Sequence, residues 1–161
     1  MAKPPILIAC CGNPMAGDDS FGHLVAEALR DDPPAGAEVV DLGMNPGSLL
    51  DYVEGRAALV LVDAAHVPGM DCGRLIECDW RSASAPPLAS GGAISSHGLS
   101  IIDQIKLADR LKLLPAVVKI VAVTMAPSSK TTAPTETMLS QLPIAIECVR
   151  QTTKKLADGM G

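Results

Sequence analysis

Four side chains lie at points of the sequence where chemistry commonly occurs. Asp18 and Asp19 are adjacent and stand between an apolar run and an amphipathic segment. Asp63 closes a second apolar run, and His97 shortly precedes another amphipathic segment. Two carboxylates and an imidazole suit a borderline divalent metal, and three protein ligands leave coordination positions for water or a substrate group. Alternatively, paired carboxylates can share a proton and drive water onto a peptide bond.

Each of these side chains also has an ordinary structural explanation. Asp is a favoured N-cap, and a negative charge near a helix N-terminus contributes roughly 0.3–1 kcal/mol, which accounts for one acid of the pair. Asp63 can simply meet solvent where a strand leaves the core, and His97 can help to cap the helix that follows it. The dipole of that helix disfavours a protonated histidine, so a neutral His97 could also serve as a metal ligand or a base.

A strand, a turn and a helix position the acidic pair. The apolar run 6–11 is followed by a turn and then by apolar residues at helical spacing over 21–29. A second continuous apolar run, 57–63, is typical of a strand buried on both faces. The order strand, helix, strand, helix, strand implies parallel pairing, and in a flavodoxin-like order the first and third strands are neighbours. Asp63 should then end beside Asp19, at the edge where such sheets bind ligands, which favours a site.

The other sequence patterns complete an α/β chain. Asn45-Pro46 has the form of an N-cap followed by proline at the first helical position. Ser140 is a suitable N-cap for the last helix, with Pro143 tolerated in its first turn. We expect further strands at 38–41, 74–78 and 117–124, and further helices at 45–52, at 101–111 and from 140 onward. No linker divides the sequence, so we expect one domain over residues 1–161.

The composition excludes several classes of protein. Hydrophobic residues make up 48% of the chain and charged residues 19%, which argues against disorder. Aromatic residues make up 2%, the net charge is −5, and no basic run is longer than Lys154-Lys155, so we expect no nucleic-acid partner. No apolar run approaches the ~20 residues of a membrane span, and the first strand begins too early for a signal peptide.

The cysteines and the absence of several known motifs exclude further kinds of site. The five cysteines are odd in number and form no C-x-x-C pair, so we expect neither a disulfide framework nor a zinc ribbon, and we expect a reducing cytoplasm. The turn at 12–17 lacks the glycine spacing of a dinucleotide site, and Asp18 and Asp19 stand where a phosphate would sit. The serine elbow and the H-E-x-x-H motif are absent. We therefore expect no organic cofactor, and a flavodoxin-type binding domain is disfavoured.

Four short motifs follow one another along nearly the whole chain. They are Gly12-Asn13-Pro14, Gly17-Asp18-Asp19 with Gly22, Val62-Asp63-Ala64, and Ser96-His97-Gly98-Leu99-Ser100. Each is a weak signal alone, but in this order and spacing the set resembles the maturation endopeptidases of nickel–iron hydrogenases. The resemblance implies an α/β three-layer sandwich, in which a twisted, mostly parallel sheet of about five strands lies between helices.

The resemblance also implies an activity and a set of site residues. Such enzymes act in the cytoplasm, where they cleave a short C-terminal extension from the hydrogenase large-subunit precursor after nickel has been inserted. Asp19, Asp63 and His97 match the positions thought to contact that nickel, and these three would be both the catalytic and the metal-binding residues. The position of Asp19 is Glu or Asp in the family, so this chain has the shorter acid. The substrate carries the nickel, and no resident metal is required.

A second function fits the same three residues. A non-enzymatic nickel-binding chaperone or assembly factor would use the same ligands but leave the C-terminal extension intact. In either case we expect Asp63 and His97 to be exposed at the sheet edge, so that replacing them changes the free energy of unfolding by no more than about 1 kcal/mol. We expect the protein to be a monomer.

The segment 82–96 is rich in Ser, Ala, Gly and Pro, and a long polar loop inside a compact domain often carries function. We predict that it helps to dock the precursor. Deleting part of it should raise the Kd of the protein for the precursor, as measured by calorimetric titration. An unchanged Kd would remove this segment from the docking surface.

Overall fold

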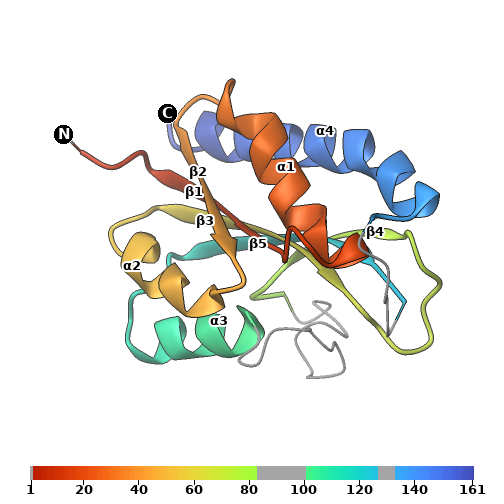
Figure 1. The fold of residues 1–161 in the computed structure, drawn as a ribbon. Helices are drawn as coiled ribbons and strands as arrows, with labels where there is room; N and C mark the ends of the chain where they lie inside the picture. Colours follow the sequence, from red (N-terminus) through yellow and green to blue (C-terminus); the bar gives the residue numbers. More distant parts are fainter. Residues whose placement is uncertain (1, 83–100, 127–132) are drawn as a thin grey trace.

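The computed structural model describes residues 2–82, 101–126 and 133–161. Its strands are β1 (Ile6–Cys11), β2 (Ala37–Gly43), β3 (Ala58–Ala65), β4 (Leu75–Asp79) and β5 (Val117–Thr124). They form one sheet in the order β2-β1-β3-β5-β4 (Figure 1). All the pairings are parallel except that of β4, which runs antiparallel to β5 at one edge. The expected mostly parallel sheet, with the first and third strands adjacent, is confirmed.

Helices cover both faces of this sheet and complete three layers. The described helices are α1 (Phe21–Arg30), α2 (Leu49–Val53), α3 (Ile101–Arg110) and α4 (Glu136–Asp158), with short 3-10 turns η1 (Gly17–Ser20) and η2 (Pro46–Ser48). α1 and α4 lie on one side of the sheet, and α2 and α3 lie on the other (Figure 1). None of these helices combines the length and the apolar character needed to cross a bilayer.

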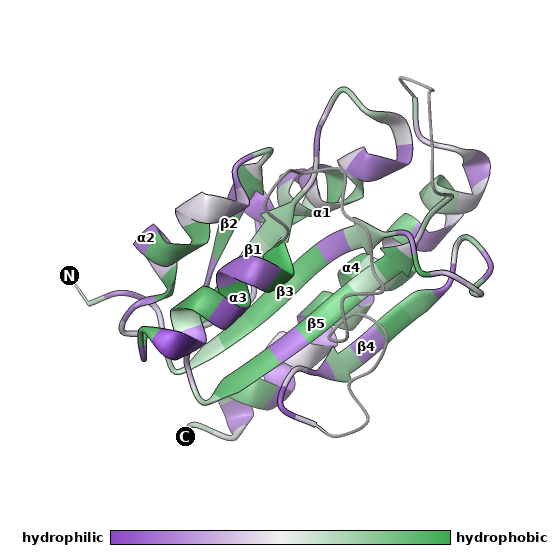
Figure 2. Ribbon diagram, turned by 90° about the horizontal axis from the view of Figure 1, so that it is seen from below, coloured by the Kyte–Doolittle hydropathy of each residue, from purple (hydrophilic) through white to green (hydrophobic). Residues whose placement is uncertain are grey.

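The two central strands form the middle of the core. Every residue of β1 and β3 is buried, as their continuous apolar runs predict. Alternate side chains enter opposite layers: Leu7 and Cys11 belong to the cluster beneath α2 and α3, whereas Ile8 and Cys10 belong to the cluster beneath α1 and α4. In Figure 2, β3 and β5 are mostly apolar, and each is interrupted by one hydrophilic stretch. In a chain with few aromatic residues, the core is thus built mainly of aliphatic side chains.

β3 is longer than its sequence pattern suggests. We expected the strand to end on Asp63, but it continues to Ala65. The reason is its pairing with β5, which extends beyond Asp63 to the Ala65–Thr124 pair. Asp63 therefore lies inside a paired strand rather than at its tip.

The last helix begins earlier than expected. α4 starts at Glu136, and its N-cap is Thr135, whose side-chain oxygen accepts a hydrogen bond from the N–H of Met138 (3.3 Å). The expectation that Ser140 caps this helix is wrong. Ser140 lies within the helix, and Pro143 follows in its interior, where proline removes one backbone hydrogen bond.

The first helix touches the first strand at a glycine. A Cβ atom added to Gly22 would lie 1.9 Å from the carbonyl oxygen of Cys11, so the two backbones are in direct contact. This approach fixes the start of α1, and with it η1, against the end of β1.

We predict that Gly22→Ala lowers the free energy of unfolding by at least about 2 kcal/mol, because the new methyl group meets backbone that cannot move aside. Urea denaturation measures the change. Gly159→Ala is the control: its methyl group would meet only ordinary contacts, the nearest at 3.5 Å, and should change stability by less than about 0.5 kcal/mol. Equal stability of the two variants would contradict the packing described.

Candidate functional site

The turn after β1 holds Asp19 by its backbone. The N–H of Asp19 donates to the carbonyl of Ala16 (3.0 Å), and its carbonyl accepts from the N–H of Asn13 (3.0 Å). Gly12 packs so closely on this segment that an added Cβ would lie 2.6 Å from the carbonyl oxygen of Asp19. The turn thus has room only for glycine at position 12. Its two hydrogen bonds hold both the N–H and the carbonyl of Asp19 in place.

Asp19 and Asp63 form a buried pair of carboxylates. η1 contacts β3, and the two residues are 5% and 6% exposed. Burial raises the pKa of Asp63 well above its ordinary value, and the negative charge of Asp19 raises it further. The N–H of Ala64, which donates to Asp63 Oδ1 (2.8 Å), acts in the opposite direction. Because the two negative charges destabilise each other, this site favours an added proton or cation.

The neighbouring Asp18 has a different role. Its Oδ1 accepts from the N–H of Thr135 (2.7 Å), and its Oδ2 accepts from the Thr135 hydroxyl (3.1 Å). Asp18 thereby ties η1 to the first turn of α4 instead of capping α1, whose own N-cap, Ser20, makes no side-chain cap bond. The two adjacent acids are thus distinguished: Asp18 holds the turn in place, and Asp19 contributes to the carboxylate pair.

The expectation that Asp63 is an exposed edge group is wrong. Its burial accompanies the extension of β3: Asp63 pairs with Ala122 of β5, and the β3–β5 ladder continues for two more residues. It shares a face with Leu61 and Ala65, which belong to the cluster beneath α2 and α3. Ile101, the first residue of α3, is part of the same cluster.

The third predicted ligand, His97, lies outside the described residues, so its placement stays a prediction. Among residues 2–82, 101–126 and 133–161, no three His, Cys, Asp or Glu side chains are arranged to hold a metal ion. Within that part of the chain, the structure brings two of the three predicted site residues, Asp19 and Asp63, to one place. The predicted docking segment also lies outside the described residues, apart from Ser82.

The buried cysteines beside the site are not nucleophiles. Burial raises the pKa of both Cys10 and Cys11 far above the ordinary thiol value, and Asp63 raises both further. A reactive cysteine needs the thiolate form, so these two act as small apolar side chains. All five cysteines of the chain are free.

Sequence reasoning missed a second polar contact at the same edge of the sheet. Asp41, near the end of β2, accepts from the N–H of Gly43 (2.9 Å), and its other oxygen lies 2.6 Å from His23 Nδ1. The sequence did contain a signal for Asp41: it is the last residue of the expected strand 38–41, just as Asp63 is the last residue of the apolar run 57–63. His23 carried no signal, because it lies within the pattern of an amphipathic helix.

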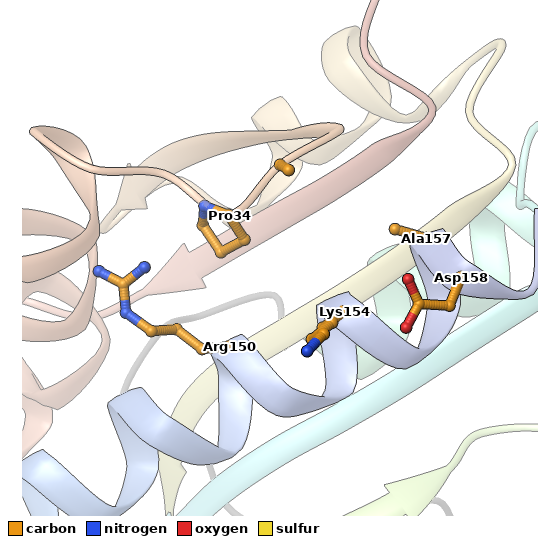
Figure 3. A pocket seen from close by; sticks show the side chains of 6 residues that line it. Pro34, Arg150, Lys154, Ala157 and Asp158 are labelled. Atoms are coloured by element: carbon orange, nitrogen blue, oxygen red, sulfur yellow. The ribbon is translucent and has the colours of Figure 1, made fainter.

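A pocket lies away from this site. Its volume is about 350 Å³, and it is lined by the loop before β2 and the last turns of α4: Pro34, Ala35, Arg150, Lys154, Ala157 and Asp158 (Figure 3). Because β2 begins at Ala37, the pocket opens at the amino edge of the sheet, opposite the edge that carries Asp19. It is therefore not part of the candidate site.

Comparison with known sequences identifies one family. Residues 23–152 match the sequence model of a family described as hydrogenase maturation protease (HycI). The match covers most of the chain and begins just after the two adjacent acids. No curated protein sequence matches the chain.

Solved structures share the fold over nearly their whole length. The chain is similar to the hydrogenase maturating endopeptidase HybD from E. coli, with a TM-score of 0.79 and 23% identity over 93% of this chain and 92% of that one. It is similar to the [NiFe] hydrogenase maturation protease HybD from Thermococcus kodakarensis, with a TM-score of 0.72 and 18% identity over 91% and 97%. An endopeptidase from Escherichia coli has a TM-score of 0.75 and 25% identity over 89% and 88%.

The raised pKa of Asp63 predicts a pH-dependent effect of Asp63→Asn on stability. In the unfolded chain this carboxyl titrates near its ordinary value, about 3.9. The folded protein holds the proton more tightly, so the group lowers stability progressively as the pH rises above that value. Asn does not titrate. At pH 8 the variant should therefore be more stable than the wild type, and near pH 4 the gain should vanish.

Urea denaturation across this pH range measures the difference. Asp71→Asn removes an exposed carboxylate and should stay within about 0.5 kcal/mol of the wild type at every pH. A gain for Asp63→Asn that does not depend on pH, or a loss of stability at pH 8, would contradict the buried pair.

Proposed function

The chain belongs to the hydrogenase maturation protease family, and on that premise we propose that it removes the C-terminal extension of a nickel–iron hydrogenase large-subunit precursor after nickel has been inserted. The family makes the chain a peptidase and the large-subunit precursor its substrate. The extension, the dependence on nickel and the residues that sense it are the parts that this proposal adds. We place the reaction in the cytoplasm, where the precursor matures.

The observation that carries the proposal is the buried pair of Asp19 and Asp63. The two carboxylates are 5% and 6% exposed; burial raises the pKa of Asp63, and the negative charge of Asp19 raises it further. A divalent cation brought by the substrate would neutralise both charges, and His97 would supply the nitrogen ligand of the set. Imidazole is a ligand that suits nickel, and the two carboxylates would supply the negative charge that balances a divalent ion.

The same pair explains how the enzyme distinguishes loaded from unloaded precursor. Without a cation, burial and the negative charge of Asp19 together raise the pKa of Asp63, so this carboxyl keeps its proton to a higher pH than usual. A nickel ion held by the precursor replaces that proton, because metal ligands must be deprotonated. Only the loaded precursor therefore gains the full interaction with Asp19 and Asp63.

Cleavage adds one water molecule across the scissile peptide bond and gives a new carboxylate on the mature subunit and an amine on the released extension. Nickel bound by both proteins would orient that bond or activate the water. The turn that fixes the Asp19 backbone and the strand that fixes Asp63 keep the two carboxylates rigid, so substrate binding need not order them. No organic cofactor takes part in this scheme.

We predict that the wild-type protein shortens the nickel-loaded precursor and leaves the nickel-free precursor intact. Mass spectrometry of the large subunit before and after incubation measures the change. Asp63→Asn and His97→Ala should each lower the cleavage rate by at least about a hundredfold, because each loses one ligand of the shared ion. Asp71→Asn, which removes an exposed acid, should cleave at the wild-type rate.

Two results would count against the proposal. Normal cleavage by Asp63→Asn or His97→Ala would show that the site lies elsewhere. Tight binding of loaded precursor without any mass change would instead favour the non-enzymatic nickel-binding assembly factor.

A further inference from the structure

A chain of hydrogen bonds joins the surface of α1 to the turn that holds Asp19. His23 Nδ1 lies 2.6 Å from Asp41 Oδ2. The other oxygen of Asp41 accepts from the N–H of Gly43 (2.9 Å). The carbonyl of Gly43 then accepts from the N–H of Gly12 (3.1 Å), and Gly12 packs against the carbonyl of Asp19.

These contacts lie where the sheet itself is irregular. β1 and β2 pair in register as far as Cys10 and Asp41, and then the register shifts so that Cys11 faces Gly43. Such a bulge leaves one residue outside the regular ladder, and Gly43 has a φ of 56° that favours glycine. The Asp41 side chain accepts a hydrogen bond from the N–H of Gly43. The backbone geometry at Gly43 and Gly12, here called the corner, therefore depends on how Asp41 is oriented.

The orientation of Asp41 depends in turn on His23. The two side chains are 20% and 23% exposed, so their contact is largely shielded from water. An ionised carboxylate only accepts hydrogen bonds, so Nδ1 of His23 carries the hydrogen. The other ring nitrogen lies 3.3 Å from Glu27 Oε1, but the Glu27 side chain is 52% exposed and one helical turn away. Of the two partners of His23, only Asp41 is connected to the turn that holds Asp19, so a change at His23 reaches that turn through Asp41.

We propose that His23 is a positioning residue for the carboxylate pair. It orients Asp41, Asp41 holds the corner formed by Gly43 and Gly12, and that corner sets the backbone of Asp19. His23 does not belong to the Asp19–Asp63 pair, so its loss should affect the alignment of Asp19 and not the docking of the precursor. Only the activity readout of this inference rests on the proposed function.

Three variants test the kinetic consequence. His23→Ala should lower kcat for the loaded precursor by about tenfold while KM stays within about twofold, because small misplacements of a site residue are costly to the chemical step. His23→Asn should recover most of the rate, since its side-chain amide can donate to Asp41 from nearly the position of Nδ1. Glu27→Ala removes only the exposed contact and should match the wild type.

Amide hydrogen exchange, followed by NMR, gives a readout that needs no substrate. His23→Ala should accelerate exchange at Gly12 and Gly43, His23→Asn should not, and Val60 in the centre of β3 should be unchanged in both. If His23→Ala keeps wild-type kcat and exchange, if Asn fails to rescue, or if Val60 exchanges faster to the same degree, the inference is wrong. If the wild type does not cleave, the proposed function fails, and the exchange data still decide the role of His23.

Discussion

The structure depends on a repulsion that the fold maintains: two carboxylates, Asp19 and Asp63, are held together out of water. Such a pair lowers the stability of a protein unless something neutralises it. Every residue of the two central strands β1 and β3 is buried, and all of them except Asp63 are apolar, so this core provides the stability that lets the pair persist. The Asp19–Asp63 pair lowers the stability of the fold, a cost that is common where the groups of a binding site are held in place before the ligand binds.

Close backbone packing, rather than long side chains, holds the pair in place. Gly22 lets α1 touch the end of β1, and Gly12 lets the following turn close on Asp19. Asp18 then ties that turn to the start of α4 through Thr135. The sheet and the layer formed by α1 and α4 thus converge on one turn of few residues, which leaves the carboxylates little freedom to separate. In the function proposed above, a cation entering between them would meet ligands whose positions are already set.

Sequence patterns predicted most of the fold and only part of the site. Continuous apolar runs identify fully buried strands, and helical spacing identifies α1 and α3, because both signals are local. The burial of Asp63 depends on pairing with β5, and the role of Asp18 depends on Thr135, which is 117 residues away along the chain. No local pattern carries such information. Asp41 was missed although it follows a strand pattern much as Asp63 does.

The most direct test of this account is the pKa of Asp63, measured by the pH dependence of its side-chain carboxyl carbon shift in NMR. The wild-type protein should show a value well above the ordinary 3.9 or so of an aspartate, and Asp19→Asn should bring it down, because one source of the shift is removed. Binding of nickel-loaded precursor should lower it further than binding of nickel-free precursor. An ordinary value in the wild type, unchanged in Asp19→Asn, would contradict the central claim.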